Sequence, residues 1–390
     1  MHDTTEPETG FRAGRYAAID IGTVTCRMLV ADVDEAGRLH ELDREYAITN
    51  LGESVDATGV LKPEAMQRVA DTVARYLEVL RGFETPEHPV IETKAMATSA
   101  ARDARNADEF EALLAGLGVT LSVIPGQREA ALSFAGASCD FLGERLLVVD
   151  IGGGSTEVIA GRAGGAPDRS HSFNIGCRRV TEKFFRADPP SAAELEEARA
   201  WVEAGMRPYF DELRGAGFAP ERLVAVAGTA TTVVSVHEHM KVYDTARVHK
   251  AVITRSVLDG VADELERVPL AERERIVGLD PGRAPVIVAG MVILQTVLDL
   301  AGVDAFTVSE SDILHGIMLD EAANQPPQSR KRAKFATIGA CMWGRGGIGI
   351  RRRLKIFRLR SCGFESRRPY QSKLFAIAIF SGMFRRGSNR

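Results

Sequence analysis

The segment Asp20-Ile-Gly-Thr-Val-Thr25 recurs 130 positions later as Asp150-Ile-Gly-Gly-Gly-Ser-Thr156. An apolar run precedes each copy and another follows it. Each copy therefore predicts a hairpin in which a strand ends in an acid, a glycine turn carries hydroxyl groups, and a second strand returns. A repeat at this distance predicts two similar half-domains, each offering one loop. Two such loops, placed face to face, would clamp a phosphate with backbone N–H groups and hydroxyls.

The composition is that of a globular protein long enough for two domains. The chain has 390 residues, of which 45% are hydrophobic and 26% charged. The net charge of -4 hides an asymmetry, because residues 324–390 hold 17 Lys or Arg against one acid. The remaining, acidic part of the chain argues against specific nucleic-acid binding. A polyanionic ligand would need a locally positive site or metal ions there.

Several classes of protein are disfavoured by what the sequence lacks. The five cysteines form no CxxC pair, so neither a zinc site nor a disulfide framework is predicted. The first residues, MHDTTEPETG, are polar and acidic rather than typical of a signal peptide, and no apolar run reaches 18 residues. We therefore expect a cytoplasmic protein with no membrane partner.

Hydrophobic periodicity predicts strands that alternate with helices. The predicted strands cover residues 16–33 (as a hairpin), 39–48, 90–97, 119–124, 146–149, 157–161, 172–175, 223–227 and 306–308. The predicted helices cover residues 63–82, 106–116, 127–137, 191–214, 255–267, 270–277, 285–301 and 312–320. Asn106 is a candidate helix cap, and Ser191 with Glu194 is a candidate capping box. This alternation implies an α/β architecture with mixed sheets, divided near Ser138.

A third hydroxyl-rich glycine turn, Gly228-Thr-Ala-Thr-Thr232, follows the predicted strand at 223–227. All three turns leave the carboxyl end of an apolar strand, which is where α/β sheets bind ligands. The sequence thus predicts a phosphate-binding cleft. Its candidate residues are Gly22, Thr23, Thr25, Cys26, Gly152, Gly153, Gly154, Ser155, Thr156, Gly228 and Thr229.

Three acids, Asp20, Asp150 and Glu157, lie on or beside the loops. A carboxylate would repel a phosphate, so near one it is expected to hold Mg²⁺ or to position an attacking water. The alternative for Asp20 is that it caps its own loop.

These motifs resemble a known family. The matching stretches are AAIDIGTVTCRMLVADV, KAMATSAARDARNADEF, VIPGQREAALSFAG, LLVVDIGGGSTEVIAG, AVAGTATTV, VIVAGMVIL and SESDILHG. In this order they resemble the exopolyphosphatases and guanosine pentaphosphate phosphohydrolases of the Ppx/GppA family, within the sugar kinase, heat-shock ATPase and actin superfamily. The resemblance implies two actin-like (ribonuclease H-like) domains, at 16–137 and 138–323, with mixed sheets flanked by helices and a cleft between them.

The resemblance also assigns catalytic roles. Glu129 matches the family's catalytic base, which would accept a proton from the attacking water. Arg102 matches an arginine that contacts phosphate. The residues alone favour a different interpretation, in which Glu129 is a solvated acid in a first helical turn and Arg102 is a surface partner of Asp103 or Asp108.

Two positions depart from the family pattern. Val24 stands where an asparagine is usual in the first loop, so an amide is lost. His315 stands where an arginine commonly precedes the glycine of the last motif. Both changes bear on the choice of substrate more than on the class of reaction.

The expected activity is release of terminal phosphate from inorganic polyphosphate, from guanosine pentaphosphate, or from both, with Mg²⁺ as cofactor. The alternatives are a kinase of the same superfamily and a non-catalytic sensor that binds polyphosphate or guanosine tetraphosphate. A homodimer is implied by the resemblance alone. Residues 1–15 and 324–390 are expected to be disordered, the latter as a basic extension or as an arm for polyanions.

Overall fold

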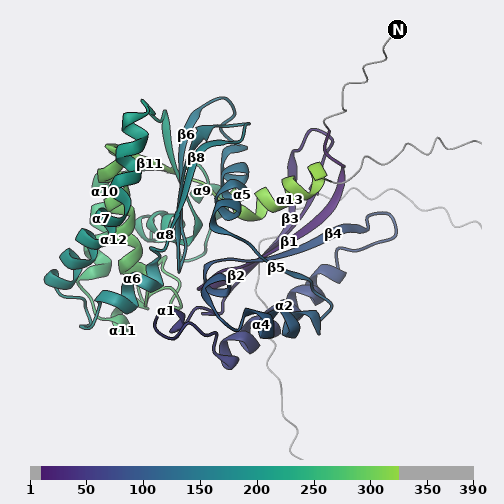
Figure 1. Ribbon diagram of the computed structural model, residues 1–390, viewed down its shortest axis with the longest axis horizontal. Coiled ribbons are helices and arrows are strands. Elements are labelled where there is room, and N and C mark those ends of the chain that lie inside the picture. Colours follow the sequence, from purple (N-terminus) through teal and green to yellow (C-terminus); the bar gives the residue numbers. More distant parts are fainter. Residues whose placement is uncertain (1–9, 325–390) are drawn as a thin grey trace, which may run out of the picture. The chain divides into compact units, whose positions relative to one another are not determined.

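The computed structural model describes residues 10–324, which form two mixed sheets flanked by helices (Figure 1). The first sheet has the order β3-β2-β1-β4-β5 and the second the order β10-β11-β9-β6-β7-β8. The strands of the first sheet are β1 (Gly14–Ile21), β2 (Thr25–Val33), β3 (Leu39–Ile48), β4 (Val90–Ala97) and β5 (Leu121–Val123). Those of the second are β6 (Arg145–Ile151), β7 (Thr156–Arg162), β8 (Pro167–Phe173), β9 (Arg222–Val226), β10 (Val252–Thr254) and β11 (Ala305–Val308).

The two sheets follow the same path, as the sequence repeat predicts. In the first, β1, β2 and β3 form an antiparallel meander, and β4 then pairs parallel to β1. In the second, β6, β7 and β8 form the meander, and β9 pairs parallel to β6. The predicted α/β class with mixed sheets is confirmed.

Helices cover both faces of the sheets, which explains why the central strands are continuously apolar. On β1, for example, Ala17 and Ile19 pack into one cluster, whereas Tyr16 and Ala18 pack into another on the opposite face. The helices are α1 (Val55–Thr58), α2 (Pro63–Arg81), α3 (Ser99–Asp103), α4 (Ala107–Ala115), α5 (Gly126–Ser138), α6 (Cys177–Phe184), α7 (Ala192–Gly215), α8 (Ala227–His237), α9 (Thr245–Val248), α10 (Arg255–Glu266), α11 (Leu270–Arg273), α12 (Ile287–Ala301) and α13 (Ile313–Asn324).

The predicted helix caps had different outcomes. Ser191 and Glu194 form the expected capping box at the start of α7. Asn106 occupies the N-cap position of α4 but makes no capping bond. Its side chain instead accepts from the N–H of Leu61 and donates to the carbonyl of Leu61, so it ties α4 to the segment before α2.

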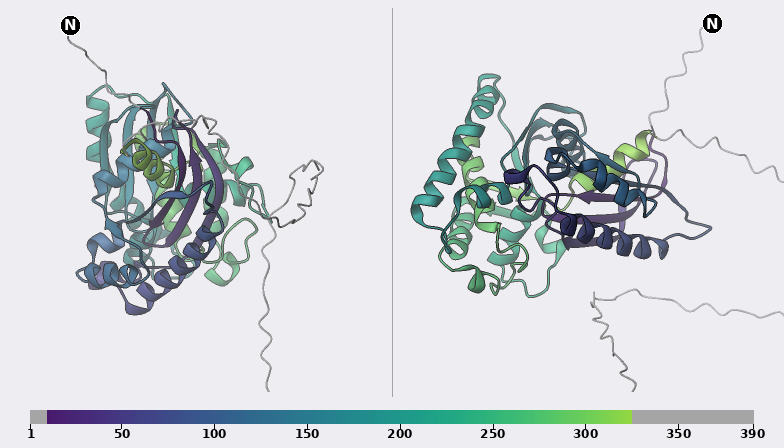
Figure 2. Two further views of the ribbon diagram at one scale, coloured as in Figure 1. Left: turned by 90° about the vertical axis from the view of Figure 1, so that its right-hand side faces the viewer. Right: turned by 60° about the horizontal axis from the view of Figure 1, so that its bottom comes forward.

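Helices α5 and α13 cross between the two sheets. α5 packs on β6, β7 and β8, whereas α13 returns from the second sheet to pack on β1 and β2. Figure 2 shows α13, in yellow-green, lying across the purple strands of the N-terminal sheet. At the crossing, a Cβ on Gly136 would overlap the Asp312 carbonyl oxygen, and one on Gly316 would overlap that of Leu132. The two backbones are therefore in close contact, and the two halves are joined by an exchange of helices.

The expected domain boundary near Ser138 stays a prediction. Strand β1 begins at Gly14, two residues before the first domain was expected to start. Of the lead expected at residues 1–15 and the tail expected at 324–390, residues 1–9 and 325–390 lie outside the described residues. Gly14 and Arg15 instead belong to β1, and Asn324 ends α13. Within residues 10–324, no helix combines the length and apolar character that a membrane crossing requires.

Candidate active site

The two repeated loops have the same internal geometry. The N–H of Gly22 donates to the carbonyl of Thr25 at 2.8 Å, and the N–H of Gly152 donates to that of Ser155 at 2.9 Å. Each bond closes the turn between the two strands of its hairpin, β1–β2 and β6–β7. The repeat thus produces two equivalent turns.

The loops meet tip to tip. A Cβ on Gly153 would lie 2.6 Å from Cγ2 of Val24, and one on Gly154 would lie 2.7 Å from Oγ1 of Thr23 and 2.5 Å from Oγ of Ser99. Glycine is required at both positions because any side chain would force the loops apart. The face-to-face arrangement expected from the sequence is therefore present, and Val24 serves as an apolar contact between the loops.

A cavity of about 60 Å³ lies between the loops. Eleven of the predicted site residues line it: Asp20, Gly22, Thr23, Thr25, Glu129, Asp150, Gly152, Gly153, Gly154, Ser155 and Gly228. Further lining residues that the sequence did not single out for the site include Arg27, Thr98, Ser99, Cys177, Ala227 and Arg283.

The other five predicted residues lie outside the lining. Cys26 and Thr156 occupy equivalent positions in the two hairpins, and both are fully buried in the sheets. Burial raises the pKa of the Cys26 thiol far above its usual range, so this group is an apolar packing residue. Glu157 is buried behind the second loop, and Arg102 contacts Glu129 from outside the cavity.

The segment Gly228–Thr232, predicted as a third turn, is instead the beginning of α8. The chain passes from β9 into this helix through Ala227, whose φ of 64° is unfavourable for a residue with a side chain. Gly228 does reach the cavity, where the guanidinium of Arg283 lies against it. Thr229 points elsewhere and packs on Gly290 of α12. The sequence interpretation failed because a helix can follow directly on a strand when one residue adopts a left-handed conformation.

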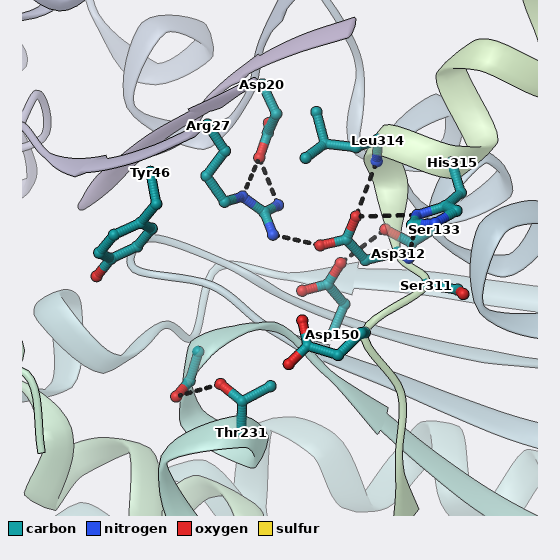
Figure 3. A network of polar contacts seen from close by, with 12 residues as sticks. Asp20, Arg27, Tyr46, Ser133, Asp150, Thr231, Ser311, Asp312, Leu314 and His315 are labelled. Atoms are coloured by element: carbon teal, nitrogen blue, oxygen red, sulfur yellow. Dashed lines mark hydrogen bonds and ion pairs between the residues drawn. The ribbon is translucent and has the colours of Figure 1, made fainter. Parts of the chain in front are cut away.

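The acid of the first loop faces a cation, whereas the acid of the second loop faces another acid. In the first hairpin, Asp20 pairs in register with Arg27, and the side chains form an ion pair at 2.6 Å. In the second hairpin, the equivalent pair is Asp150 and Glu157, two carboxylates on neighbouring strands. Figure 3 shows Arg27 between Asp20 and Asp312, with Asp150 and its partner Ser133 nearby.

Burial raises the pKa of both acids of the second hairpin. Burial raises the pKa of Asp150 to about 6, although the Ser133 hydroxyl, which donates at 2.7 Å, opposes the shift. Burial also raises the pKa of Glu157 well above its usual range, and the charges of Glu129 and Asp150 add to the shift. Both carboxyls of the second hairpin therefore hold their protons to a higher pH than an exposed acid does.

Glu129 lies in the first turn of α5 and faces the cavity. Burial raises its pKa to about 7, whereas Arg102, whose Nη1 donates to Oε2 at 3.0 Å, lowers it. Arg102 also donates to the carbonyl of Ile124, which fixes the guanidinium beside α5. A buried carboxylate with a pKa near neutrality is suited to act as a general base. Neither the solvated acid nor the Asp103 or Asp108 pairing of the alternative interpretation is found.

Two hydroxyls in the cavity wall have no hydrogen-bond partner within residues 10–324. They are Oγ1 of Thr23 and Oγ of Ser99, whose residues are 6% and 2% exposed. An unpaired buried hydroxyl costs about 1–3 kcal/mol, so two of them at one place indicate donors kept for a ligand. Thr23 was predicted, whereas Ser99 lies in the matching stretch KAMATSAARDARNADEF but was not singled out within it.

Arg27 could have been found from the sequence. A four-residue turn over residues 22–25 places Asp20 opposite Arg27 in the hairpin register. Arg283, by contrast, follows a Pro-Gly pair with no motif that indicates a site. The departure at His315 is explained structurally: its Nε2 lies 2.9 Å from Glu41, and its Nδ1 accepts from the N–H of Asp312. His315 is thus part of the network behind Arg27, outside the cavity lining.

Two hairpins of the same design face each other across a cavity at the junction of two mixed sheets, and this arrangement defines an actin-like protein. A family model described as the Ppx/GppA phosphatase family matches residues 29–325. The chain belongs to this family and is a hydrolase of its phosphatase class.

Proteins of similar sequence and structure match most of the described chain and support this assignment. Exopolyphosphatase 2 of Mycobacterium tuberculosis is 38% identical over 324 residues, which cover 79% of this chain and 98% of that protein. The crystal structure of an exopolyphosphatase-like protein is 35% identical with a TM-score of 0.72, covering 80% and 98% of the two chains. That of the Aquifex aeolicus family member is 28% identical with a TM-score of 0.66, covering 80% and 100%.

Proposed function

We propose that this protein releases terminal phosphate from inorganic polyphosphate, and that guanosine pentaphosphate is a second candidate substrate. The single observation that carries the proposal is the pair of unpartnered buried hydroxyls, Thr23 and Ser99, in the same cavity wall as Glu129. The names of the relatives with 38% and 35% identity support polyphosphate as the substrate.

In the proposed reaction the terminal phosphoryl group lies between the two loops. The Thr23 and Ser99 hydroxyls and the loop N–H groups donate to its oxygens. Glu129 accepts a proton from a water whose oxygen attacks the terminal phosphorus. The bond from that phosphorus to the bridging oxygen breaks, and the shortened chain leaves with this oxygen. Arg102 holds the carboxylate of Glu129 in orientation through its bond at 3.0 Å.

The donor set of the cavity fits Mg²⁺ as a proposed cofactor. Within residues 10–324, no three His, Cys, Asp or Glu side chains cluster as a metal site. Mg²⁺, however, commonly takes one or two carboxylates and completes its shell with water and substrate phosphate. Asp150 is the best candidate, because it lines the cavity and forms no ion pair with a described residue, whereas Asp20 is paired with Arg27. A bound Mg²⁺ would offset the charge of the phosphate oxygens.

The proposal is tested by phosphate release from polyphosphates of defined length and from guanosine pentaphosphate, with Mg²⁺ or with a chelator. We expect Glu129→Gln to lower kcat by about 10²–10⁴-fold because the proton acceptor is lost. Glu264→Gln, on an exposed position of α10, is the matched control and should leave the rate unchanged.

The same assay separates the alternatives. Equal rates for the wild type and Glu129→Gln would remove Glu129 from its role. Binding of polyphosphate or guanosine tetraphosphate without any turnover by the wild type would favour a sensor. Formation of ADP together with a phosphorylated product, in place of free phosphate, would favour a kinase.

A further inference from the structure

Helix α6 supports the second loop from behind. The N–H groups of Cys177 and Arg178 donate to the carbonyls of Gly152 and Gly153 at 3.0 and 2.8 Å. Nε of Arg179 donates to the carbonyl of Gly154 at 3.1 Å. Three consecutive loop carbonyls are therefore held by the first turn of α6, and the Arg179 side chain holds the one at the loop tip.

The same guanidinium reaches across to the other half of the molecule. Nη2 of Arg179 lies 2.6 Å from a carboxylate oxygen of Asp103, and Nη1 pairs with Asp56. Asp103 is the last residue of α3, the five-residue helix that also carries Ser99 and Arg102. The Arg179 side chain is 16% exposed, whereas those of Asp56 and Asp103 are 37% and 29% exposed, so both ion pairs are partly open to solvent.

We propose that Arg179 is a positioning residue, which sets the second loop at a fixed distance from helix α3 and so from the Arg102–Glu129 pair. This inference rests on the proposed function. A continuous set of bonds runs from the Gly154 carbonyl through Arg179 to Asp103, and the neighbouring Arg102 continues it to Glu129. No other described side chain bonds both to a carbonyl of the second loop and to α3.

The chemistry of arginine suits this task. A guanidinium presents five N–H donors in a planar fork and can serve three partners in fixed directions. A lysine at this position would place one ammonium near either Asp103 or Gly154, and would therefore keep the charge but lose the link. The ion pair with Asp56 joins Arg179 to α1, which carries no site residue. This ion pair therefore helps to hold the halves together without contacting the catalytic groups.

The test compares Arg179→Ala, Arg179→Lys and Arg186→Ala. Arg186 lies two residues beyond the end of α6 and bonds to carbonyls of residues 182, 183 and 185, so its removal is a matched control. We expect Arg179→Ala to lower kcat by about 10-fold or more with a smaller change in KM, since misplacement by an ångström carries such costs. Arg179→Lys should recover only part of the loss, and Arg186→Ala should match the wild type.

The pH dependence of kcat/KM distinguishes a positioning role of Arg179 from a purely structural role. If α3 drifts, the Arg102–Glu129 bond loosens, and the acidic limb of the kcat/KM profile for Arg179→Ala moves to higher pH. Asp103→Asn should reproduce this shift, and the double variant should lose little more than either single variant. An unchanged acidic limb or strictly additive losses would overturn the inference. A wild type that releases no phosphate from any substrate would instead overturn the proposed function.

Discussion

Nη1 of Arg102 lies 3.0 Å from Oε2 of Glu129, and this bond joins the two halves of the molecule. Arg102 belongs to α3, which packs beside β4 of the first sheet, whereas Glu129 belongs to α5, which packs on the second sheet. The orientation of the proposed base thus depends on how α3 and α5 are placed relative to each other, and the Arg102–Glu129 bond is one contact that fixes this placement.

The acidic limb of the activity profile should report Glu129. With a pKa of about 7, the carboxylate gains its charge, and kcat/KM rises, as the pH increases through neutrality. Arg102→Met removes the group that lowers this pKa, so the limb should move up by about one pH unit. Arg105→Met, a nearby arginine that bonds to Thr58, is the control. A limb that stays in place in Arg102→Met would contradict the pairing.

Removing an unpartnered hydroxyl should weaken substrate binding without lowering the stability of the fold. Ser99→Ala removes a buried donor with no partner, so the free protein should be as stable as the wild type or up to about 1 kcal/mol more stable. KM should rise by about 10-fold, because a charged phosphate loses a hydrogen bond. Ser235→Ala is the contrasting control, since its hydroxyl already donates to Gly278 at 2.6 Å. That variant should lose stability and keep its KM; a stability loss in Ser99→Ala with no change in KM would refute the assignment.

Asp150→Asn should stabilise the protein at neutral and higher pH. The folded state holds the Asp150 proton up to a pH of about 6, well above the ordinary value of 3.8, so the wild type loses stability as the pH rises between these values. The variant does not undergo this loss, which amounts to about 3 kcal/mol for a shift of about two pH units. Urea unfolding at pH 4.5 and pH 8 measures it, with Asp263→Asn on an exposed position of α10 as control. Equal gains at both pH values would contradict the electrostatic cause.

The crossing of α5 and α13 should not tolerate a methyl group. In Gly136→Ala and Gly316→Ala the new Cβ would overlap a backbone carbonyl of the facing segment, so the helices must separate, at a cost of about 2–3 kcal/mol. Gly260→Ala, at an open position of α10, should instead gain about 0.5–1 kcal/mol. Denaturant midpoints of the three variants make the comparison. Neutral changes at both crossing glycines would show that the contact is not tight in solution.

The two hairpins and the residues of their loops could be predicted from short stretches of sequence. The acid, the glycine turn and the returning strand are adjacent in sequence, so register follows from turn length, and the pairing of Asp20 with Arg27 was within reach of the sequence. The amphipathic helix at residues 63–81 and the capping box of α7 are equally local. By contrast, the start of α8 was misjudged, because the single left-handed residue Ala227 replaces a turn and nothing in the residue types requires it.

The sequence by itself determined the two repeated glycine loops and the acids beside them. It also determined the family resemblance by which Glu129 was assigned as the base. Only the tertiary structure decided which groups contact each other. Val24 packs against the second loop, and Ser99 lines the cavity. Arg179 bonds to both halves of the molecule. The reason is physical. Hairpin geometry is fixed by bonds between near neighbours, whereas contacts between the halves depend on how α5 and α13 cross, and this is set by packing among residues far apart in the chain.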